Sequence, residues 1–263
     1  MPPRVVVIVQ ARLGSTRLPG KTLADIAGRP MLDWVLDRAE RIPGIDGLVL
    51  ATTDRLRDDK LVDFARKQGV RCVRGSEQDV LDRFHVAVTE HPADVIVRVT
   101  PDCPLLDPEV AGQVLAKFLQ TPGRYDYVSN VHPPTFPDGL DTEVFSRDAL
   151  ETAWREAELP SDREHVTPFM WRRAGPERFR LGNVTGARDL STERWTVDTA
   201  TDLDFVRKIY EILGPSRPIF GMEEVLDLLH THPEPRDINA GQRRNEGYQR
   251  SLAADAAAPR TSR

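Results

Sequence analysis

Short apolar runs alternate with amphipathic segments along the first half of the chain. The runs are rich in β-branched residues and predict strands at 4–10, 47–53, 70–73 and 94–99. Segments with apolar residues at helical spacing predict helices at 31–42, 58–68, 79–89 and 108–119. Strands that alternate with helices in this way predict an α/β fold, with a mainly parallel sheet flanked by helices.

The loops after these strands are the predicted place of a ligand. Open parallel sheets bind ligands beyond the carboxyl ends of their strands. We therefore expect one crevice to be formed by the loops at 10–21, 51–55, 74–83 and 100–107.

The second half of the chain has a less regular pattern. It predicts strands at 125–130, 179–184 and 194–197, and helices at 147–158, 162–172, 202–213 and 222–230. Residues 131–145 are rich in Pro and Gly and predict a turn-rich excursion. We predict one domain over residues 1–235, with an excursion at about 125–145. Residues 236–263 hold few large apolar groups and predict a disordered tail.

Composition and charge exclude several classes of protein. The chain has 263 residues and a formal net charge of −5, which argues against a general binder of nucleic acid or of anionic membranes. No apolar run approaches the roughly 18–20 residues of a membrane span, and the N-terminus does not resemble a signal peptide. Two cysteines make neither a disulfide framework nor a zinc pattern. We expect a cytoplasmic protein without a membrane or nucleic-acid partner.

The first motif follows the first predicted strand, where residues 10–21 read Gln-Ala-Arg-Leu-Gly-Ser-Thr-Arg-Leu-Pro-Gly-Lys. Its glycines and hydroxyls suit backbone binding of phosphate, and its Arg and Lys side chains supply positive charge. It matches neither the P-loop pattern nor the Gly-x-Gly-x-x-Gly fingerprint of dinucleotide-binding folds. The alternative is an ordinary solvated basic loop.

This motif resembles the N-terminal signature of the cytidylyltransferases that activate acidic sugars, such as acylneuraminate and 3-deoxy-manno-octulosonate. The similarity is closer to their relatives named spore-coat polysaccharide biosynthesis protein F, and it covers roughly residues 4–230. It implies a Rossmann-like nucleotidyltransferase fold and a role in polysaccharide biosynthesis. It also implies that the motif binds CTP through Gln10, Ala11, Arg12, Ser15, Arg17 and Lys21. Lys21, Arg12 and Arg17 would act in catalysis by offsetting phosphate charge.

Two aspartates at predicted strand ends are candidates for a Mg²⁺ site. Asp102 follows the strand at 94–99, and Asp198 follows the strand at 194–197. Mg²⁺ is commonly held by one or two carboxylates plus substrate phosphates. The family has metal-binding aspartates at both places, so the resemblance implies Mg²⁺ as cofactor. Pro101 replaces the usual Gly before the first of them. Each Asp has an ordinary alternative role in a turn or helix cap.

Further positions are implied only by the resemblance. Thr53, Ser76 and Arg83 match segments near the nucleotide, although Ser76 also fits a helix cap. Residues facing the acceptor would be Asn130, Asp138, Asp141, Glu143, Arg163 and His165. The acceptors of the family are anionic, namely nonulosonates, octulosonates or phosphonates, and either Arg163 or Arg98 suits such a charge.

These features predict a Mg²⁺-dependent cytidylyltransferase that moves CMP from CTP to an anionic acceptor and releases pyrophosphate. The family also pairs through the segment matching 125–145, which predicts a homodimer. One alternative is a nucleotidyltransferase that uses another nucleoside triphosphate with a sugar phosphate. Another is a non-catalytic module that binds a nucleotide or a sugar.

Overall fold

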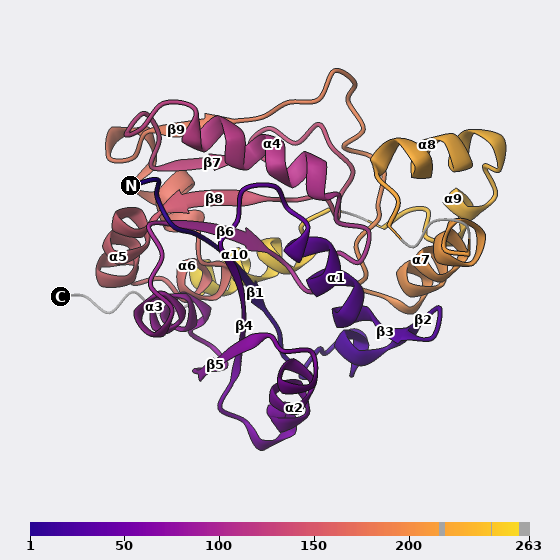
Figure 1. Ribbon diagram of the computed structural model, residues 1–263, viewed down its shortest axis with the longest axis horizontal. Helices are drawn as coiled ribbons and strands as arrows, with labels where there is room; N and C mark the ends of the chain where they lie inside the picture. Colours follow the sequence, from indigo (N-terminus) through magenta and orange to yellow (C-terminus); the bar gives the residue numbers. More distant parts are fainter. Residues whose placement is uncertain (216–218, 243, 258–263) are drawn as a thin grey trace.

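The computed structural model describes residues 1–215, 219–242 and 244–257 (Figure 1). Within these residues a seven-stranded sheet has the order β5-β4-β1-β6-β8-β7-β9. Its strands are β1 (Val5–Gln10), β4 (Gly47–Thr53), β5 (Arg71–Gly75), β6 (Val95–Val99), β7 (Tyr127–Ser129), β8 (Glu143–Ser146) and β9 (Leu181–Asn183). A separate antiparallel pair joins β2 (Asp25–Ile26) to β3 (Arg29–Pro30).

Strand β1 lies at the centre of the parallel half of the sheet. It pairs in parallel with β4 on one side and β6 on the other, so that Val7 lies between Leu48 and Val97. Residues 5–9 are at most 2% exposed, as expected for a strand covered on both faces. The predicted α/β fold with a mainly parallel sheet is confirmed.

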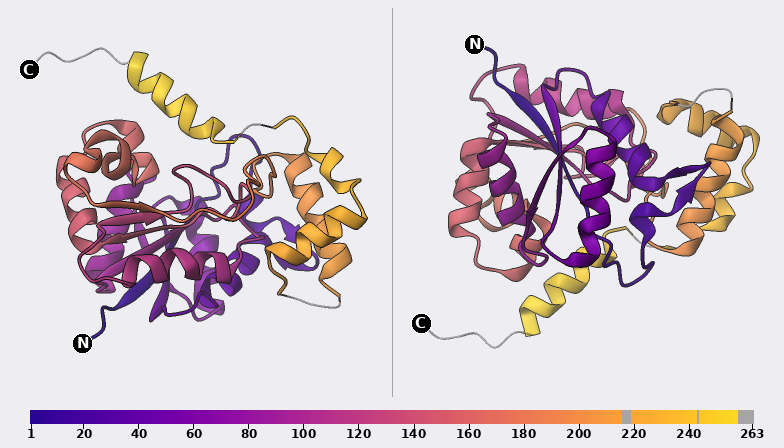
Figure 2. Two further views of the ribbon diagram at one scale, coloured as in Figure 1. Left: turned by 90° about the horizontal axis from the view of Figure 1, so that it is seen from above. Right: turned by 60° about the horizontal axis from the view of Figure 1, so that its bottom comes forward.

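Helices cover both faces of the sheet (Figures 1 and 2). They are α1 (Met31–Glu40), α2 (Asp59–Lys67), α3 (Val80–Glu90), α4 (Pro108–Leu119), α5 (Arg147–Glu156), α6 (Pro160–His165), α7 (Ala200–Leu213), α8 (Met222–Thr231), α9 (Pro235–Ile238) and α10 (Glu246–Ala257). Shorter turns are η1 (Lys21–Leu23), η2 (Leu56–Asp58), η3 (Phe169–Arg173) and η4 (Gly175–Glu177).

Alternation along β1 divides the core into two layers. Val5, Val7 and Val9 pack with buried residues of α1, α2 and α4, whereas Val6 and Ile8 pack with those of α3 and α5. Helices α7 and α8 form a third apolar cluster with residues of α1 and of the loop before α4. These layers leave the carboxyl ends of β1 and β6 open to ligands.

The expected excursion is part of the sheet and core. Strands β7 and β8 both pair within the sheet, and β8 runs antiparallel to β6. Between them, Phe136 and Leu140 are 4% and 0% exposed, in the core of this same chain. The stretch therefore packs within its own chain. The homodimer itself stays a prediction.

Two predicted elements are wrong in detail. The helix expected at 162–172 is divided into α6 and the π-helical turn η3, because Val166 between them has a φ of +72°. Among the described residues, 194–197 form no strand, and an isolated bridge joins Arg194 to Asp138. A single bridge pairs one residue with another as in a sheet, but it does not continue along the chain as a strand does.

The expected disordered tail is also wrong for most of its length. Helices α9 and α10 lie in it, while residue 243 and residues 258–263 lie outside the described part. Alanines at 253–254 and 256–257 favour a helix, and Asp255 accepts a hydrogen bond from the Ser161 backbone at 3.3 Å.

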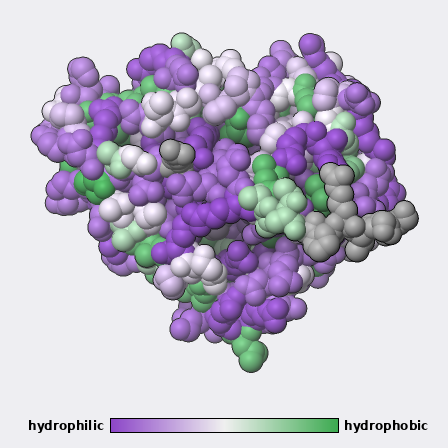
Figure 3. Space-filling view, turned by 180° about the vertical axis from the view of Figure 1, so that it is seen from behind, coloured by the Kyte–Doolittle hydropathy of each residue, from purple (hydrophilic) through white to green (hydrophobic). Residues whose placement is uncertain are grey.

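In the described residues no helix has the length and apolarity to cross a bilayer. On the face shown in Figure 3, hydrophilic residues predominate.

Candidate active site

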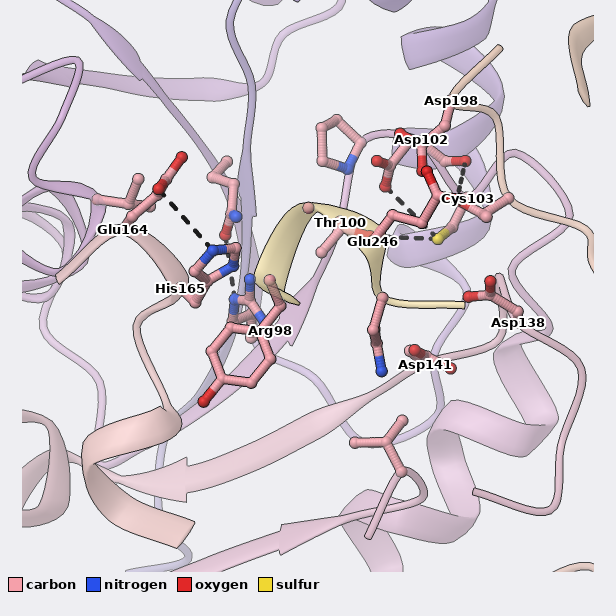
Figure 4. A pocket seen from close by; sticks show the side chains of 18 of the residues that line it. Arg98, Thr100, Asp102, Cys103, Asp138, Asp141, Glu164, His165, Asp198 and Glu246 are labelled. Carbon is pink, nitrogen blue, oxygen red and sulfur yellow. Dashed lines mark hydrogen bonds and ion pairs between the residues drawn. The ribbon is translucent and has the colours of Figure 1, made fainter. Parts of the chain in front are cut away.

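A pocket of about 680 Å³ lies beyond the carboxyl ends of β1 and β6. Most of the predicted site residues line it: Gln10, Ala11, Arg12, Ser15, Arg17, Lys21, Arg83, Asp102, Asp138, Asp141, Glu143, His165 and Asp198. Figure 4 shows Asp102, Asp198 and Glu246 at one end, and Arg98, Glu164 and His165 at another. The loops at 10–21 and 100–107 thus meet as predicted, whereas the loop at 51–55 contributes no residue to the lining of the pocket.

Hydrogen bonds to neighbouring segments fix the basic loop after β1. The Leu13 backbone N–H donates to Asp58 at 2.8 Å, and the Thr22 hydroxyl donates to the carbonyl of Arg12 at 2.9 Å. Gly20, with a φ of +73°, begins the η1 turn that carries Lys21. A side chain would strain this left-handed backbone, so glycine suits the turn.

Lys21 joins the two predicted metal-binding aspartates. Its Nζ donates to Asp102 Oδ2 at 3.2 Å, to Asp198 Oδ1 at 2.9 Å and to the Val197 carbonyl at 2.6 Å. Burial opposes the charge of Lys21, but the two carboxylates outweigh it and raise the lysine pKa. Residues far apart in the sequence thus converge on one ammonium group.

The Asp102–Asp198 pair fits a Mg²⁺ ion that also takes substrate oxygens. Burial opposes ionisation of Asp102, but the charge of Lys21 outweighs it and lowers the pKa of Asp102. The described residues contain no group of three or more His, Cys, Asp or Glu side chains arranged to hold a metal. Two hard carboxylates match the sites in which phosphates and water complete the shell of Mg²⁺.

Arg194 holds Asp198 in place from behind. Helix α7 starts with a capping box between Thr199 and Asp202, and Asp202 Oδ2 also accepts from the Asp198 backbone N–H at 3.0 Å. Arg194 contacts Asp202 at 2.9 Å, Asp138 at 3.0 Å and Asp198 at 3.3 Å. Burial opposes the charge of Arg194, but these carboxylates outweigh it and raise its pKa. Arg194 therefore links Asp198 to Asp138.

A second charged group lies at the β6–β8 side of the pocket. Arg98 forms an ion pair with Glu143, and its Nε donates to Gln10 Oε1 at 3.1 Å. Glu143 also accepts hydrogen bonds from Tyr127 at 2.6 Å and Thr167 at 2.5 Å. Burial opposes ionisation of Glu143, but Arg98 and these donors outweigh it and lower its pKa.

Asp138 and Asp141 form an acidic edge with Arg244. Arg244 pairs with Asp141, and its Nε lies 3.9 Å from Asp138 Oδ1. Burial raises the pKa of Asp138 to about 6 and that of Asp141 to about 7. At the other end of the pocket, burial lowers the pKa of His165. Charge at the acidic edge therefore depends on pH near neutrality.

Two of the expected nucleotide-binding residues support the fold instead. Thr53 is fully buried outside the pocket lining, and its hydroxyl donates to Asp58. Ser76 also lies outside the lining and accepts a hydrogen bond from the Asp79 backbone N–H at 3.1 Å, as a turn cap does. Arg83 does line the pocket, and burial, with Arg12 nearby, lowers its pKa to about 10.

Two of the expected acceptor-binding residues are likewise structural. Asn130 is fully buried and bonds to the Leu140 carbonyl and the Thr142 backbone N–H, each at 2.8 Å. Arg163 donates to Asp79 at 2.6 Å and to carbonyls at the end of α5. Neither residue lines the pocket. Their polar atoms are satisfied by the fold itself, and of the two arginines expected to meet the charge of the acceptor, Arg98 lines the pocket and Arg163 does not.

The sequence did not single out Arg194, Glu246 and Tyr248, which line the pocket, or Arg244, which pairs with the lining residue Asp141. The spacing of Arg194, four residues before Asp198, was a usable signal. The other three lie in the segment that composition predicted to be disordered, and they had no such signal.

Comparisons with known proteins agree with this geometry. A family model described as Cytidylyltransferase matches residues 6–224. Spore coat polysaccharide biosynthesis protein SpsF of Bacillus subtilis is 33% identical over 244 residues, covering 88% of this chain and 95% of that protein. The 3-deoxy-manno-octulosonate cytidylyltransferase of Acidobacterium capsulatum is 32% identical over 188 residues, covering 66% and 75%.

A solved structure agrees as well. The cytidylyltransferase from Leptospira borgpetersenii superposes with a TM-score of 0.84 at 31% identity, covering 92% of this chain and 98% of that one. The sequence match spans the basic loop, Asp102 and Asp198, and the structural match spans nearly the whole fold. This chain belongs to the family of CTP-dependent cytidylyltransferases.

Proposed function

We propose that this cytidylyltransferase moves CMP from CTP to the hydroxyl of an acidic sugar, with Mg²⁺ as cofactor and pyrophosphate as the second product. The observation that carries the proposal is the position of Lys21, between Asp102 and Asp198 at the foot of the basic loop. The named activity of the Acidobacterium relative supports an acidic sugar as acceptor.

The basic loop would bind and neutralise the triphosphate. Arg12 and Arg17 line the pocket on the same loop as Lys21. In the reaction an acceptor oxygen forms a bond to the α-phosphorus of CTP, and the bond from that phosphorus to the pyrophosphate oxygen breaks. Catalysis of this kind depends on positioning and on charge neutralisation, so no nucleophilic side chain is required.

Asp102 and Asp198 would hold Mg²⁺. When bound, a Mg²⁺ ion neutralises phosphate charge and orients phosphate and acceptor oxygens. Lys21 keeps Asp102 ionised and donates hydrogen bonds to both carboxylates, and Arg194 lies 3.3 Å from Asp198. The chain thus supplies a preformed pair of oxygen ligands.

The acceptor would bind between the Arg98–Glu143 pair and the acidic edge. Arg98 offers a cation for the carboxylate of an acidic sugar, while Asp138, Asp141 and Glu143 offer acceptors for its hydroxyls. His165 lines the same pocket. Several hydroxyl partners beside a cation favour a polyhydroxy acid over a small phosphonate.

The test is release of pyrophosphate from CTP and Mg²⁺ with 3-deoxy-manno-octulosonate or N-acetylneuraminate as the probe acid. The proposal predicts release that needs CTP, metal and acid together, and that falls about 10²–10³-fold in Asp102→Asn. Release that needs no acid, or that proceeds equally with UTP, would contradict the proposed reaction. Exposed Asp204→Asn, on α7, serves as the control and should retain wild-type rates.

A further inference from the structure

Helix α10 lies over the pocket, although the family match ends at residue 224. The helix lies on the outside of the molecule (Figure 2) and contacts α6. Residues 245–250 line the same pocket as Lys21 and Asp102. The role of this segment is therefore inferred from the contacts that it makes in this chain.

The first of these contacts places a carboxylate on the basic loop. Glu246 Oε2 lies 3.7 Å from Arg17 Nη1, and Arg17 Nη2 lies 2.8 Å from Asp198 Oδ1. The chain follows the loop closely, because a Cβ on Gly247 would lie 3.9 Å from Arg17 Nη2. Carboxylate and phosphate oxygens accept the same charge-assisted hydrogen bonds from a guanidinium group. Glu246 therefore stands where a nucleotide phosphate would meet Arg17.

Further along the helix, α10 reaches the other end of the pocket. The ring of Tyr248 lies 5.0 Å from that of His165 and 6.0 Å from that of Trp171, between centroids. The Ser251 hydroxyl lies 2.9 Å from His165 Nε2 and donates to Glu164 at 3.0 Å. One helix thus covers both the basic loop and the proposed acceptor side.

The contact between α10 and α6 has little apolar packing and leaves several polar groups without a hydrogen bond. No residue of α10 is buried, so the helix gains little from apolar packing. At the contact, the Ser161 hydroxyl, both carboxylate oxygens of Asp162 and one of Asp255 are buried without a hydrogen-bond partner among the described residues. Unpaired buried polar groups oppose docking, and elements with few buried contacts open first.

We propose that α10 is an autoinhibitory lid, in which Glu246 competes with a phosphate of CTP for Arg17. CTP binding displaces the helix, and its return accompanies product release. This inference rests on the proposed function, because it requires CTP in this pocket.

Calorimetric titration with CTP and Mg²⁺ tests the competition. Glu246→Gln should lower the Kd for CTP by about 2–5-fold, the range expected when a partly exposed ion pair is removed. Glu211→Gln is the control, because it removes the same charge from an exposed pair with Lys208 on α7, and it should leave the Kd unchanged. An unchanged or raised Kd in Glu246→Gln overturns the inference.

Amide hydrogen exchange tests the movement in the wild-type protein. Displacement predicts that residues 246–257 exchange faster with CTP bound, while the basic loop exchanges more slowly. Slower exchange of α10 would mean that the helix closes on the nucleotide, and would overturn the inference. If the wild-type protein binds no CTP, both the lid and the proposed function are contradicted. If it binds CTP while the exchange of α10 stays unchanged, only the lid is contradicted.

Discussion

Replacement of Lys21 by Ala should separate the two carboxylates from their shared cation. Lys21 is 11% exposed, and its Nζ lies 3.2 Å from Asp102 and 2.9 Å from Asp198. At about 3 Å and an effective dielectric constant near 20, each pair attracts by roughly 5–6 kcal/mol. Desolvation offsets much of this, and loss of one partner of a buried pair costs about 3–5 kcal/mol. We therefore expect that, in the absence of metal, the free energy of unfolding of Lys21→Ala is lower than that of the wild-type protein by about this amount.

Urea unfolding with and without Mg²⁺ measures this cost. Added Mg²⁺ should recover part of the loss, because the freed carboxylates suit a hard cation. Lys208→Ala is the matched control, since Lys208 pairs with Glu211 at 3.0 Å on an exposed surface and should cost less than about 1 kcal/mol. If Lys21→Ala is no less stable than Lys208→Ala, Lys21 does not hold the two carboxylates as described.

Three further predictions concern the same pocket. Asp102→Asn should fold normally but lose about 10²–10³ in kcat, measured as pyrophosphate release, and near-normal turnover would remove its assignment. Arg194→Ala should lower the free energy of unfolding by about 3–5 kcal/mol, because it leaves the carboxylates of Asp138, Asp198 and Asp202 without their shared partner. A loss under about 1 kcal/mol, measured by urea unfolding, would contradict this prediction. Because the pKa of Asp141 is raised to about 7, the folded state holds a proton that the unfolded state has lost above about pH 4. The stability of the wild-type protein relative to Asp141→Asn should therefore fall by up to about 1.4 kcal/mol per pH unit as pH rises toward 7, and a flat difference in urea titrations would contradict the shift.

The parallel half of the fold could be predicted because its signals are local. The apolar run that forms β1 is buried on both faces, and a glycine, a proline or a polar cluster stands near many element ends. The order of β8, β7 and β9 could not be predicted in this way. It depends on pairing between segments as distant as Tyr127 and Leu181, which leaves no periodic trace in the sequence.

The candidate site was predictable where a motif carried it. Lys21, Asp102 and Asp198 come from motifs and do converge. Asn130 and Arg163 have polar side chains at plausible positions, but their direction is set by tertiary contacts, and both point into the fold. Composition likewise gave no sign of α10, because no residue of this helix is buried and it therefore has no apolar face for a pattern to reveal.

The most direct test of CTP specificity and of the Asp102 assignment is calorimetric binding of CTP, UTP, ATP and GTP with Mg²⁺, on the wild-type protein and Asp102→Asn. We predict that the wild-type protein binds CTP in preference to the other three nucleotides. We also predict weaker CTP binding in the variant, because one of the two carboxylates at the proposed metal site is lost. Equal binding of all four nucleotides, or CTP binding unchanged by Asp102→Asn, would contradict these predictions.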